Sequence, residues 1–379
     1  MKVFIVSTLQ PFGHYTQILT NSLTRNSDLE VFVAAEKNPA NKTLQGCGTV
    51  FPVWEKGPFF FVPILKKILQ TKPDIIHLQH EFMMYGGAVS AVMFPLFLAV
   101  LKMLGYPVVV TIHAVLDLDN MNDDFVSAFH LKSILAKPFF LRKFFTFILW
   151  FIGLTTDGIV CHTERAVHLL EKQYRVSKKK IHVIPACIPE KKVHNRNPEK
   201  YFLYFGYITP RKGLETVISA FSDFQKKHTG YRFIIAGGTI RGQETYVESI
   251  KKLITPCPAI EFRGEIIDES ELDFLYEKAY AVINPALINV GSSGPLYQAR
   301  GYHSCILASD VDHLKEDISH LKNGMLIDNN HWADAFEMIT NDRKLRDMLI
   351  KNTIHLAKSR NPENTAVQYF NYYSRILAL

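Results

Sequence analysis

The chain has 379 residues, about twice the usual length of a domain, so we expect two domains with separate cores. Its 47% hydrophobic and 21% charged residues are typical of a globular enzyme and argue against extended disorder. The net charge of +7 favours anionic partners. Five scattered cysteines without a C-x-x-C pair argue against a disulfide framework or a zinc cluster and favour a reducing cytosol.

Short apolar runs in the first half of the chain predict buried parallel strands. They are rich in Val and Ile without strict alternation, which is the pattern of strands buried on both faces. The first run, at the amino terminus, is too short for a signal peptide. Helix-length stretches separate the runs, as at 14–26 and 88–104, so we predict a doubly wound α/β domain over 1–187. The predicted strands are Lys2–Thr8, Leu29–Ala35, Asp74–His80, Pro107–His113, Asp157–Thr163 and Lys180–Ala186.

One helical stretch raises the question of a membrane. From Lys137 to Leu154 the chain reads KPFFLRKFFTFILWFIGL, interrupted only by Arg142, Lys143 and Thr146. A spanning helix needs about 20 apolar residues, and this stretch is shorter. Two interpretations remain: a helix buried against a sheet, or a helix in a membrane interface with its basic end on anionic headgroups. We therefore expect a cytoplasmic protein and leave open a peripheral association with the inner face of a membrane.

A polar stretch over 188–200 predicts the interdomain linker, and a second βα alternation follows over 201–362. Two doubly wound domains in tandem predict a cleft lined by the carboxyl ends of their strands. The tail, 363–379, has apolar residues at helical spacing and predicts a closing helix that packs back toward the N-terminal domain. Strands of the second domain are predicted at 201–207, 231–238, 260–266, 279–286 and 305–310, with helices at 213–227, 243–253 and 269–278.

Two strand-to-helix turns of the second domain suit a phosphate group. Gly206 follows a strand, and Arg211 and Lys212 then precede a helix, which brings two cations to free N–H groups. The segment NVGSSGPLYQAR, 289–300, offers a Gly-Ser loop with Pro295 where a helix begins. A G-x-G-x-x-G after the first strand and a P-loop are both absent, which argues against dinucleotide enzymes and P-loop NTPases.

The candidate residues of the first domain follow its predicted strands. His113 ends one strand, and Gly13 and His14 follow another. His80 and Glu81 follow a third, but their spacing to His77 fits neither H-E-x-x-H nor H-x-x-E-H, so we expect no metal site there. We expect these residues to border the cleft.

Taken together, the segments resemble the GT-B glycosyltransferases, and specifically the retaining glycosyltransferase family 4 (glycosyl transferases group 1). The resemblance covers nearly the whole chain. It implies a donor site in the C-terminal domain, an acceptor site in the N-terminal one, and a role in polysaccharide or glycoconjugate biosynthesis. The segments that carry it, in the family's order, are PFGHYTQ, PDIIHLQHEF with the later YGG, VVVTIHAVL, TDGIVCHT, FGYITPRKG, IIAGG, FRGEI and GPLYQARGYHSCILASD.

The resemblance also implies roles for single residues. Lys212 matches the family lysine that meets the donor diphosphate, with Arg211 beside it, and His113 is implied to bind the donor sugar or to orient the acceptor. The acceptor side would include Gly13, His14, His80 and Glu81. No divalent metal or other cofactor is implied, because protein groups stabilise the diphosphate in this fold. The implied donor site holds Gly206, Lys212, Gly237, Asn289, Gly291, Ser292, Ser293, Gly294, Pro295, Leu296 and Gln298.

Three positions depart from the family pattern. Tyr207 stands where the family often has arginine, and Val290 and Gln298 stand where it commonly has two glutamates. Gln298 keeps an acceptor oxygen for a ribose hydroxyl, whereas Val290 has none, so the donor sugar would rely on backbone N–H groups and serine hydroxyls of the loop.

The expected partners are a UDP-, GDP- or ADP-linked sugar and a saccharide, lipid-linked or other hydroxyl acceptor. No nucleic acid is expected, because no aromatic-basic recognition motif is present. Two alternatives stay open. Loss of both acids is compatible with a degenerate glycosyltransferase that acts as a binding or scaffold subunit, and the sugar-nucleotide 2-epimerases share the fold, with Glu81 as a candidate base.

Overall fold

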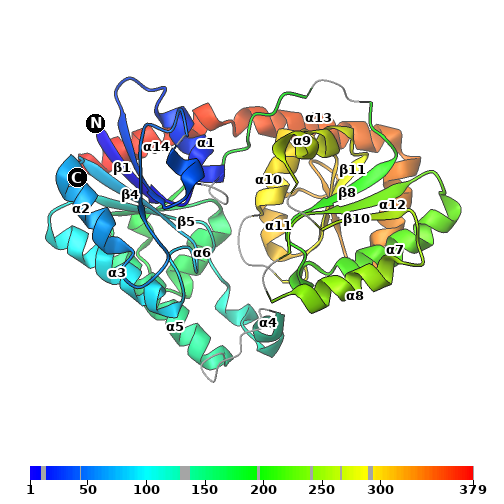
Figure 1. Cartoon of the computed structure of the whole chain (residues 1–379), viewed down its shortest axis with the longest axis horizontal. Coiled ribbons are helices and arrows are strands. Elements are labelled where there is room, and N and C mark those ends of the chain that lie inside the picture. The colour runs from blue at the N-terminus through cyan, green and yellow to red at the C-terminus, as the bar shows by residue number, and fades with distance from the viewer. Residues whose placement is uncertain are drawn as a thin grey trace. The chain divides into compact units, whose positions relative to one another are not determined.

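The structure is a computed structural model in which the described residues are 1–9, 14–42, 44–128, 137–193, 197–239, 242–264, 267–288 and 293–378 (Figure 1). The chain divides into two compact units. The first comprises Met1–Val126, Leu131–Cys187 and Arg360–Leu379, and the second is built from Ile188–Ser359. Each unit holds a parallel sheet covered by helices on both faces, so the predicted fold class is confirmed.

The first unit is built on a seven-stranded parallel sheet of order β3-β2-β1-β4-β5-β6-β7. Its central strands are buried on both faces, which explains their continuous Val and Ile. The sequence pattern missed β3, because Pro52 within it argues against a strand; β3 lies at the sheet edge, where proline is tolerated. The strands are β1 (Lys2–Ser7), β2 (Glu30–Glu36), β3 (Thr49–Trp54), β4 (Ile75–His80), β5 (Val108–Ile112), β6 (Gly158–Cys161) and β7 (Ile181–Val183).

Helices cover both faces of this sheet (Figure 1). One face packs against α2 (Phe61–Thr71), α3 (Ala88–Met103), α5 (Pro138–Thr155) and α6 (Glu164–Lys172). The other face packs against α1 (His14–Leu23) and the closing helix α14 (Pro362–Leu377). A short helix, α4 (Asp123–Ala128), precedes α5 in the chain.

The helix α5 is long and apolar enough to cross a membrane by length and composition alone. Its inner side, with Ile148, Leu149 and Ile152, is fully buried in the core of the first unit. At its carboxyl end the Lys180 ammonium donates hydrogen bonds to the carbonyls of Gly153 (2.9 Å) and Thr156 (2.7 Å), which satisfies groups that a helix end leaves open. The helix α5 is therefore a core helix that connects β5 to β6, which agrees with the first of the two interpretations, a helix buried against a sheet.

The second unit is built on a six-stranded parallel sheet of order β10-β9-β8-β11-β12-β13. One face packs against α7 (Leu214–Lys227), α8 (Glu244–Ile254), α12 (Trp332–Asn341) and α13 (Arg343–Ser359). The other packs against α9 (Glu269–Lys278), α10 (Gly294–Gly301) and α11 (Asp312–Asp317). The strands are β8 (Tyr201–Phe205), β9 (Arg232–Ala236), β10 (Ile260–Arg263), β11 (Ala281–Asn284), β12 (Ile306–Ser309) and β13 (Met325–Ile327).

Candidate donor and acceptor edges

Two glycines bring the backbone together at the carboxyl edge of the second sheet. Gly206 follows β8 with φ +152°, and Gly237 follows β9 with φ +131°. A Cβ atom on Gly237 would lie 2.1 Å from the carbonyl oxygen of Gly206, so no side chain fits there. The two strand ends can therefore approach each other only because both positions are glycine.

The turn that carries Arg211 and Lys212 packs against the loop after β11. It is a 3-10 turn over Pro210–Lys212, closed by Gly213 in the left-handed conformation (φ +61°). A Cβ on Gly213 would lie 2.8 Å from the Leu287 side chain, and the Leu287 N–H donates to the carbonyl of Arg211 (2.9 Å). The loop between β11 and α10 is thus attached to the cationic turn.

Lys212 is a half-buried cation for which the described part of the chain provides no counter-ion. Among the residues that the structure describes, no acceptor lies within hydrogen-bond distance of its Nζ atom. Burial, and then the neighbouring charge of Arg211, lower the pKa of Lys212 to about 8. A buried charge that is left without a partner in the folded chain is expected to find one in a ligand, and this one favours an anion.

The amino terminus of α10 lies beside the same glycine turn. A Cβ on Gly206 would lie 3.5 Å from Cγ of Pro295, in the first turn of α10. Ser293, the residue before α10, is fixed by hydrogen bonds between its hydroxyl and the Asn284 side chain at the end of β11 (3.2 and 3.4 Å). The N–H group of Gly294 has no acceptor among the described residues, so it is open to an anion.

The remaining predicted donor residues divide into two groups. Leu296 is fully buried and holds α10 to the sheet, whereas Gln298 is half-buried and its amide has no partner in the described part of the chain. The predictions for Asn289, Gly291 and Ser292, and the departure at Val290, lie outside the described residues. Gly206, Lys212, Gly237 and the start of α10 are therefore placed by the structure along one sheet edge.

A buried ion pair fixes α10 from below. Arg300 is fully buried, and its guanidinium pairs with the Asp317 carboxylate (3.2 Å) and also donates to the Asp317 carbonyl. The Tyr297 hydroxyl donates to the other carboxylate oxygen (2.8 Å). Two residues of α10 are thus bonded to the end of α11, and the orientation of α10 depends on this cluster.

In the first unit, His113 is held by protein partners on both ring nitrogens. Nε2 is hydrogen-bonded to Gln79 Oε1 (2.7 Å), and Nδ1 is hydrogen-bonded to His162 Nε2 (3.1 Å). His162 is bonded in turn to the carbonyl of Ile184 (2.9 Å). Burial, and then the nearby His162, lower the pKa of His113 well below its ordinary value. The His113 ring is therefore neutral at pH 7 and fixed in orientation.

The sequence argument missed His162, although a signal for it exists. His113 directly follows β5 and His162 directly follows β6, and these strands are neighbours in the sheet. Residues that follow neighbouring parallel strands meet at the same edge. The Tyr15 ring packs against both imidazoles, at centroid distances of 4.9 and 5.2 Å.

A buried polar network ties the closing helix to this edge. The Tyr369 hydroxyl of α14 is hydrogen-bonded to Tyr15 and to Thr111 (both 3.0 Å), and Thr111 is bonded to His77 (2.7 Å). His77 is also bonded to the Tyr373 hydroxyl of α14 (2.6 Å), and burial lowers the pKa of His77 to about 3. His77 therefore has a structural role in the interior of the first unit.

The predicted acceptor-side residues differ in their burial and in the elements that carry them. His80 is buried with its ring against Phe82 and Phe94, at centroid distances of 5.3 and 4.7 Å, and burial lowers its pKa to about 4. Glu81 is exposed just beyond β4. His14 begins α1, and the prediction for Gly13 lies outside the described residues.

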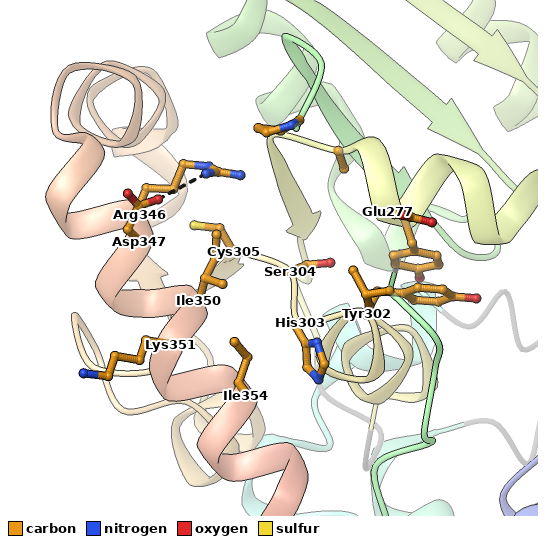
Figure 2. Close-up of a pocket in the computed structure, with 14 residues that line it drawn as sticks. Glu277, Tyr302, His303, Ser304, Cys305, Arg346, Asp347, Ile350, Lys351 and Ile354 are labelled. Carbon is orange, nitrogen blue, oxygen red and sulfur yellow. Dashed lines mark hydrogen bonds and ion pairs between the residues drawn. The ribbon is translucent and has the colours of Figure 1, made fainter. Parts of the chain in front are cut away.

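A pocket of about 330 Å³ in the second unit lies away from the donor residues (Figure 2). Ala279, Cys305 and Pro198, which line it, precede β11, β12 and β8, so the pocket lies at the amino edge of the sheet. Figure 2 shows Arg346 and Asp347 of α13 on one side and Glu277 and Tyr302 on the other. None of the predicted site residues lines it, and it belongs to a different region of the unit.

Two family models together match almost the whole chain. Residues 5–192 match "Glycosyltransferase Family 4", and residues 188–356 match "Glycosyl transferases group 1". A curated relative, the O-antigen chain mannosyltransferase RfbU of Salmonella typhimurium, is 25% identical over 202 residues, which are 50% of this chain and 52% of the relative. The chain thus matches about half the length of that relative.

Solved structures show the same fold over the full chain. HepE of Anabaena, solved with UDP, superposes with a TM-score of 0.74 at 15% identity, covering 99% of this chain and 100% of that one. Sucrose-phosphate synthase of Thermosynechococcus elongatus gives a TM-score of 0.76 at 16% identity, covering 100% and 99%. With both family models matched in order and two Rossmann-like units present, the chain belongs to the family 4 glycosyltransferases of the GT-B fold.

Proposed function

We propose that the protein is a retaining glycosyltransferase that moves a hexosyl group from a nucleotide sugar to a hydroxyl of a saccharide or lipid-linked acceptor, and that it acts in the cytoplasm. The observation that carries this proposal is Lys212, a half-buried amine that has no partner among the described residues, in the turn that follows Gly206. The relatives support it: RfbU is named as a mannosyltransferase, and HepE has been solved with UDP and with UDP-glucose.

The proposed chemistry depends on the charge of the leaving group. As the bond between sugar and diphosphate breaks, negative charge grows on the phosphate, and the ammonium of Lys212 and the N–H of Gly294 stabilise it more strongly than in the ground state. Arg211 adds a second positive charge in the same turn. The acceptor hydroxyl attacks the oxocarbenium-like sugar from the leaving-group face, and the leaving phosphate takes its proton. This chemistry needs no metal and no covalent nucleophile.

Gln298 supplies the ribose contact in this proposal. Its side chain lies one helical turn beyond the start of α10, and its amide oxygen can accept a hydrogen bond from a ribose hydroxyl. A neutral acceptor binds a hydroxyl less strongly than a carboxylate does. We therefore propose that the backbone N–H groups and serines before α10 provide a larger share of donor affinity here.

His113 has the role of a positioned neutral group. Because both nitrogens are bonded within the first unit, the ring is held still, and it is proposed to contact the donor sugar or to orient the acceptor. Glu81, exposed beyond the next strand, is proposed to belong to the acceptor side.

The proposal is tested by incubating the purified protein with UDP-, GDP- and ADP-linked sugars and a panel of saccharide and lipid-linked acceptors. We expect one donor to bind in calorimetry, and transfer to give a glycoside with the donor's anomeric configuration, measured by proton NMR. An inverted product contradicts the retaining mechanism. A 2-epimer formed without acceptor indicates an epimerase, donor binding without turnover indicates a binding subunit, and failure of all donors to bind contradicts the whole proposal.

The pKa of Lys212 predicts how donor affinity depends on pH. In the free protein this pKa is about 8, below the ordinary lysine value of 10.5, and a bound diphosphate favours the charged form and raises it. Binding then takes up a proton above pH 8, so affinity falls as pH rises. We expect the affinity for UDP to drop about tenfold between pH 7 and pH 9, measured by calorimetry. The Lys212→Arg variant, charged throughout, isolates the nucleotide's own titration, and an identical slope for both proteins contradicts the assignment.

A further inference from the structure

The outer side of α5 carries a stripe of exposed side chains that is apolar except for Lys143. Phe139, Lys143, Phe147, Trp150 and Leu154 follow one another at intervals of three or four residues, so they share one face of the helix. The exposed fractions are 64% for Phe139, 48% for Phe147, 38% for Trp150 and 49% for Leu154. This face is opposite the buried residues Ile148, Leu149 and Ile152. Packing in the core explains the inner apolar side of α5, but it does not explain why the opposite side, which is exposed to water, is also apolar.

The neighbouring helices extend this surface. α3 packs beside α5, and α2 lies beside α3, with the rings of Phe61 and Phe97 5.8 Å apart (Figure 1). α3 exposes Val89, Leu96 and Met103, and α2 exposes Val62 and Leu69. We call the exposed residues of α2, α3 and α5 the outer face.

The charge of the outer face has one sign. The three helices contain five cations and no Asp or Glu: Lys66, Lys67, Lys102, Arg142 and Lys143. The chain as a whole holds 36 acidic residues in 379, so 45 helical residues without one is a marked local bias. A surface of this composition is complementary to a layer that is apolar within and anionic at its boundary.

A hollow on α5 provides a place for an anionic group. It measures about 310 Å³ and is lined by Lys143, Thr146, Phe147, Trp150, Gln173 and Arg175. Neither Lys143 nor Arg175 forms an ion pair with a carboxylate in the described part of the chain. Gln173 is fixed by hydrogen bonds to Asp117 (2.7 Å) and Asp119 (3.2 Å). Two unpaired cations beside two exposed aromatic rings suit a phosphate at the boundary of a hydrocarbon layer.

From this arrangement we propose that the outer face is a docking surface for an anionic phospholipid bilayer, with the hollow between Lys143 and Arg175 receiving a headgroup phosphate. The helix lies in the plane of the interface and does not span it, because its inner side belongs to the core of the first unit. The proposal does not depend on the proposed transferase activity.

Trp150 makes the docking directly measurable. The chain has three tryptophans, and Trp54 and Trp332 are fully buried while Trp150 is exposed on the outer face. We expect phosphatidylglycerol-containing vesicles to shift the tryptophan emission to the blue and to shield it from acrylamide, and phosphatidylcholine vesicles to do neither. Trp150→Phe should remove the spectral change while the protein still co-sediments with the vesicles.

Variants then test the contacts one by one. Lys143→Gln and Arg175→Gln should each weaken co-sedimentation with phosphatidylglycerol vesicles about fivefold, the effect of about 1 kcal/mol per basic residue. Phe139→Ser should weaken it too. Matched controls are Lys344→Gln and Phe274→Ser, exposed residues of the second unit, which should leave it unchanged.

Three outcomes would overturn the proposal: no co-sedimentation at low salt, equal binding to both kinds of vesicle, or binding that the outer-face variants do not change. Dimerisation without vesicles that Phe139→Ser abolishes would show that a second copy of the chain covers the face instead. Because no readout uses a nucleotide sugar, failure here leaves the transferase proposal intact, and failure of transfer leaves the docking result intact.

Discussion

Replacing Lys212 by alanine is expected to lower kcat/KM for sugar transfer by about 10²–10³-fold, the usual effect of removing one group that stabilises a charged transition state. The ammonium is half-buried in the turn before α7 and has no protein partner in the described residues, so we expect it to act on a ligand. Steady-state rates with the donor found by calorimetry measure the effect, and affinity for UDP should fall in the same variant.

The same absence of a protein partner separates function from stability. Removing this amine breaks no hydrogen bond or ion pair among the described residues, so Lys212→Ala should leave the free energy of unfolding within about 1 kcal/mol of the parent. Lys226→Ala is the matched control: Lys226 lies in α7, the helix that follows the cationic turn, and pairs with Asp223 in solvent. Full activity in Lys212→Ala would remove this residue from the mechanism, and a large loss in Lys226→Ala would show that charge in general is what matters.

The strands of both sheets could be predicted because they are buried on two faces. Burial on both faces favours runs of apolar residues such as Val, Ile and Phe, and the sequences of β1, β4 and β5 contain such runs. The strands at the sheet edges were harder to predict from the sequence. β3 contains Pro52, and β13 has three residues, so neither displays a pattern long enough to be distinguished from a loop.

The proposed donor edge could be inferred from the sequence only where the residue type itself carries the chemistry. A lysine before a helix and a glycine after a strand indicate an anion site from sequence alone. The attachment of Leu287 to the turn of Arg211 and the near-contact of Gly237 with Gly206 depend on backbone geometry, and no sequence spacing encodes them. In the same way, the two bonds that occupy His113 join strands far apart in the chain.

Helix α5 shows a different limit of prediction from sequence. Periodicity in 137–154 could indicate that α5 is apolar, but it could not separate the side that enters the core from the side that stays in water, because both are apolar. Only packing makes that distinction: Ile148 and Leu149 face the sheet, whereas Phe147 and Trp150 are exposed. A uniformly apolar helix therefore needs a structure before its outer face can be interpreted.

Arg300 is expected to be the most important single side chain for the stability of the second unit. Arg300→Met should lower the free energy of unfolding by about 3–5 kcal/mol, because it leaves the Asp317 carboxylate buried without its counter-ion. Urea denaturation followed by circular dichroism measures the loss in the transition of the second unit. Tyr297→Phe removes the hydrogen bond from the hydroxyl to the same carboxylate and should lower the free energy of unfolding by about 1–3 kcal/mol.

The control for this prediction is the double replacement Arg300→Met with Asp317→Leu. If the loss comes from a buried carboxylate that has lost its guanidinium partner, removing that carboxylate should restore most of the stability, since a buried ion pair is often replaced by apolar residues at little loss. A double variant as unstable as Arg300→Met would instead assign the effect to lost packing of the arginine. Because α10 begins with the proposed phosphate-binding groups and is bonded to α11 through this cluster, Arg300→Met should also weaken UDP binding, and the double variant should do so less.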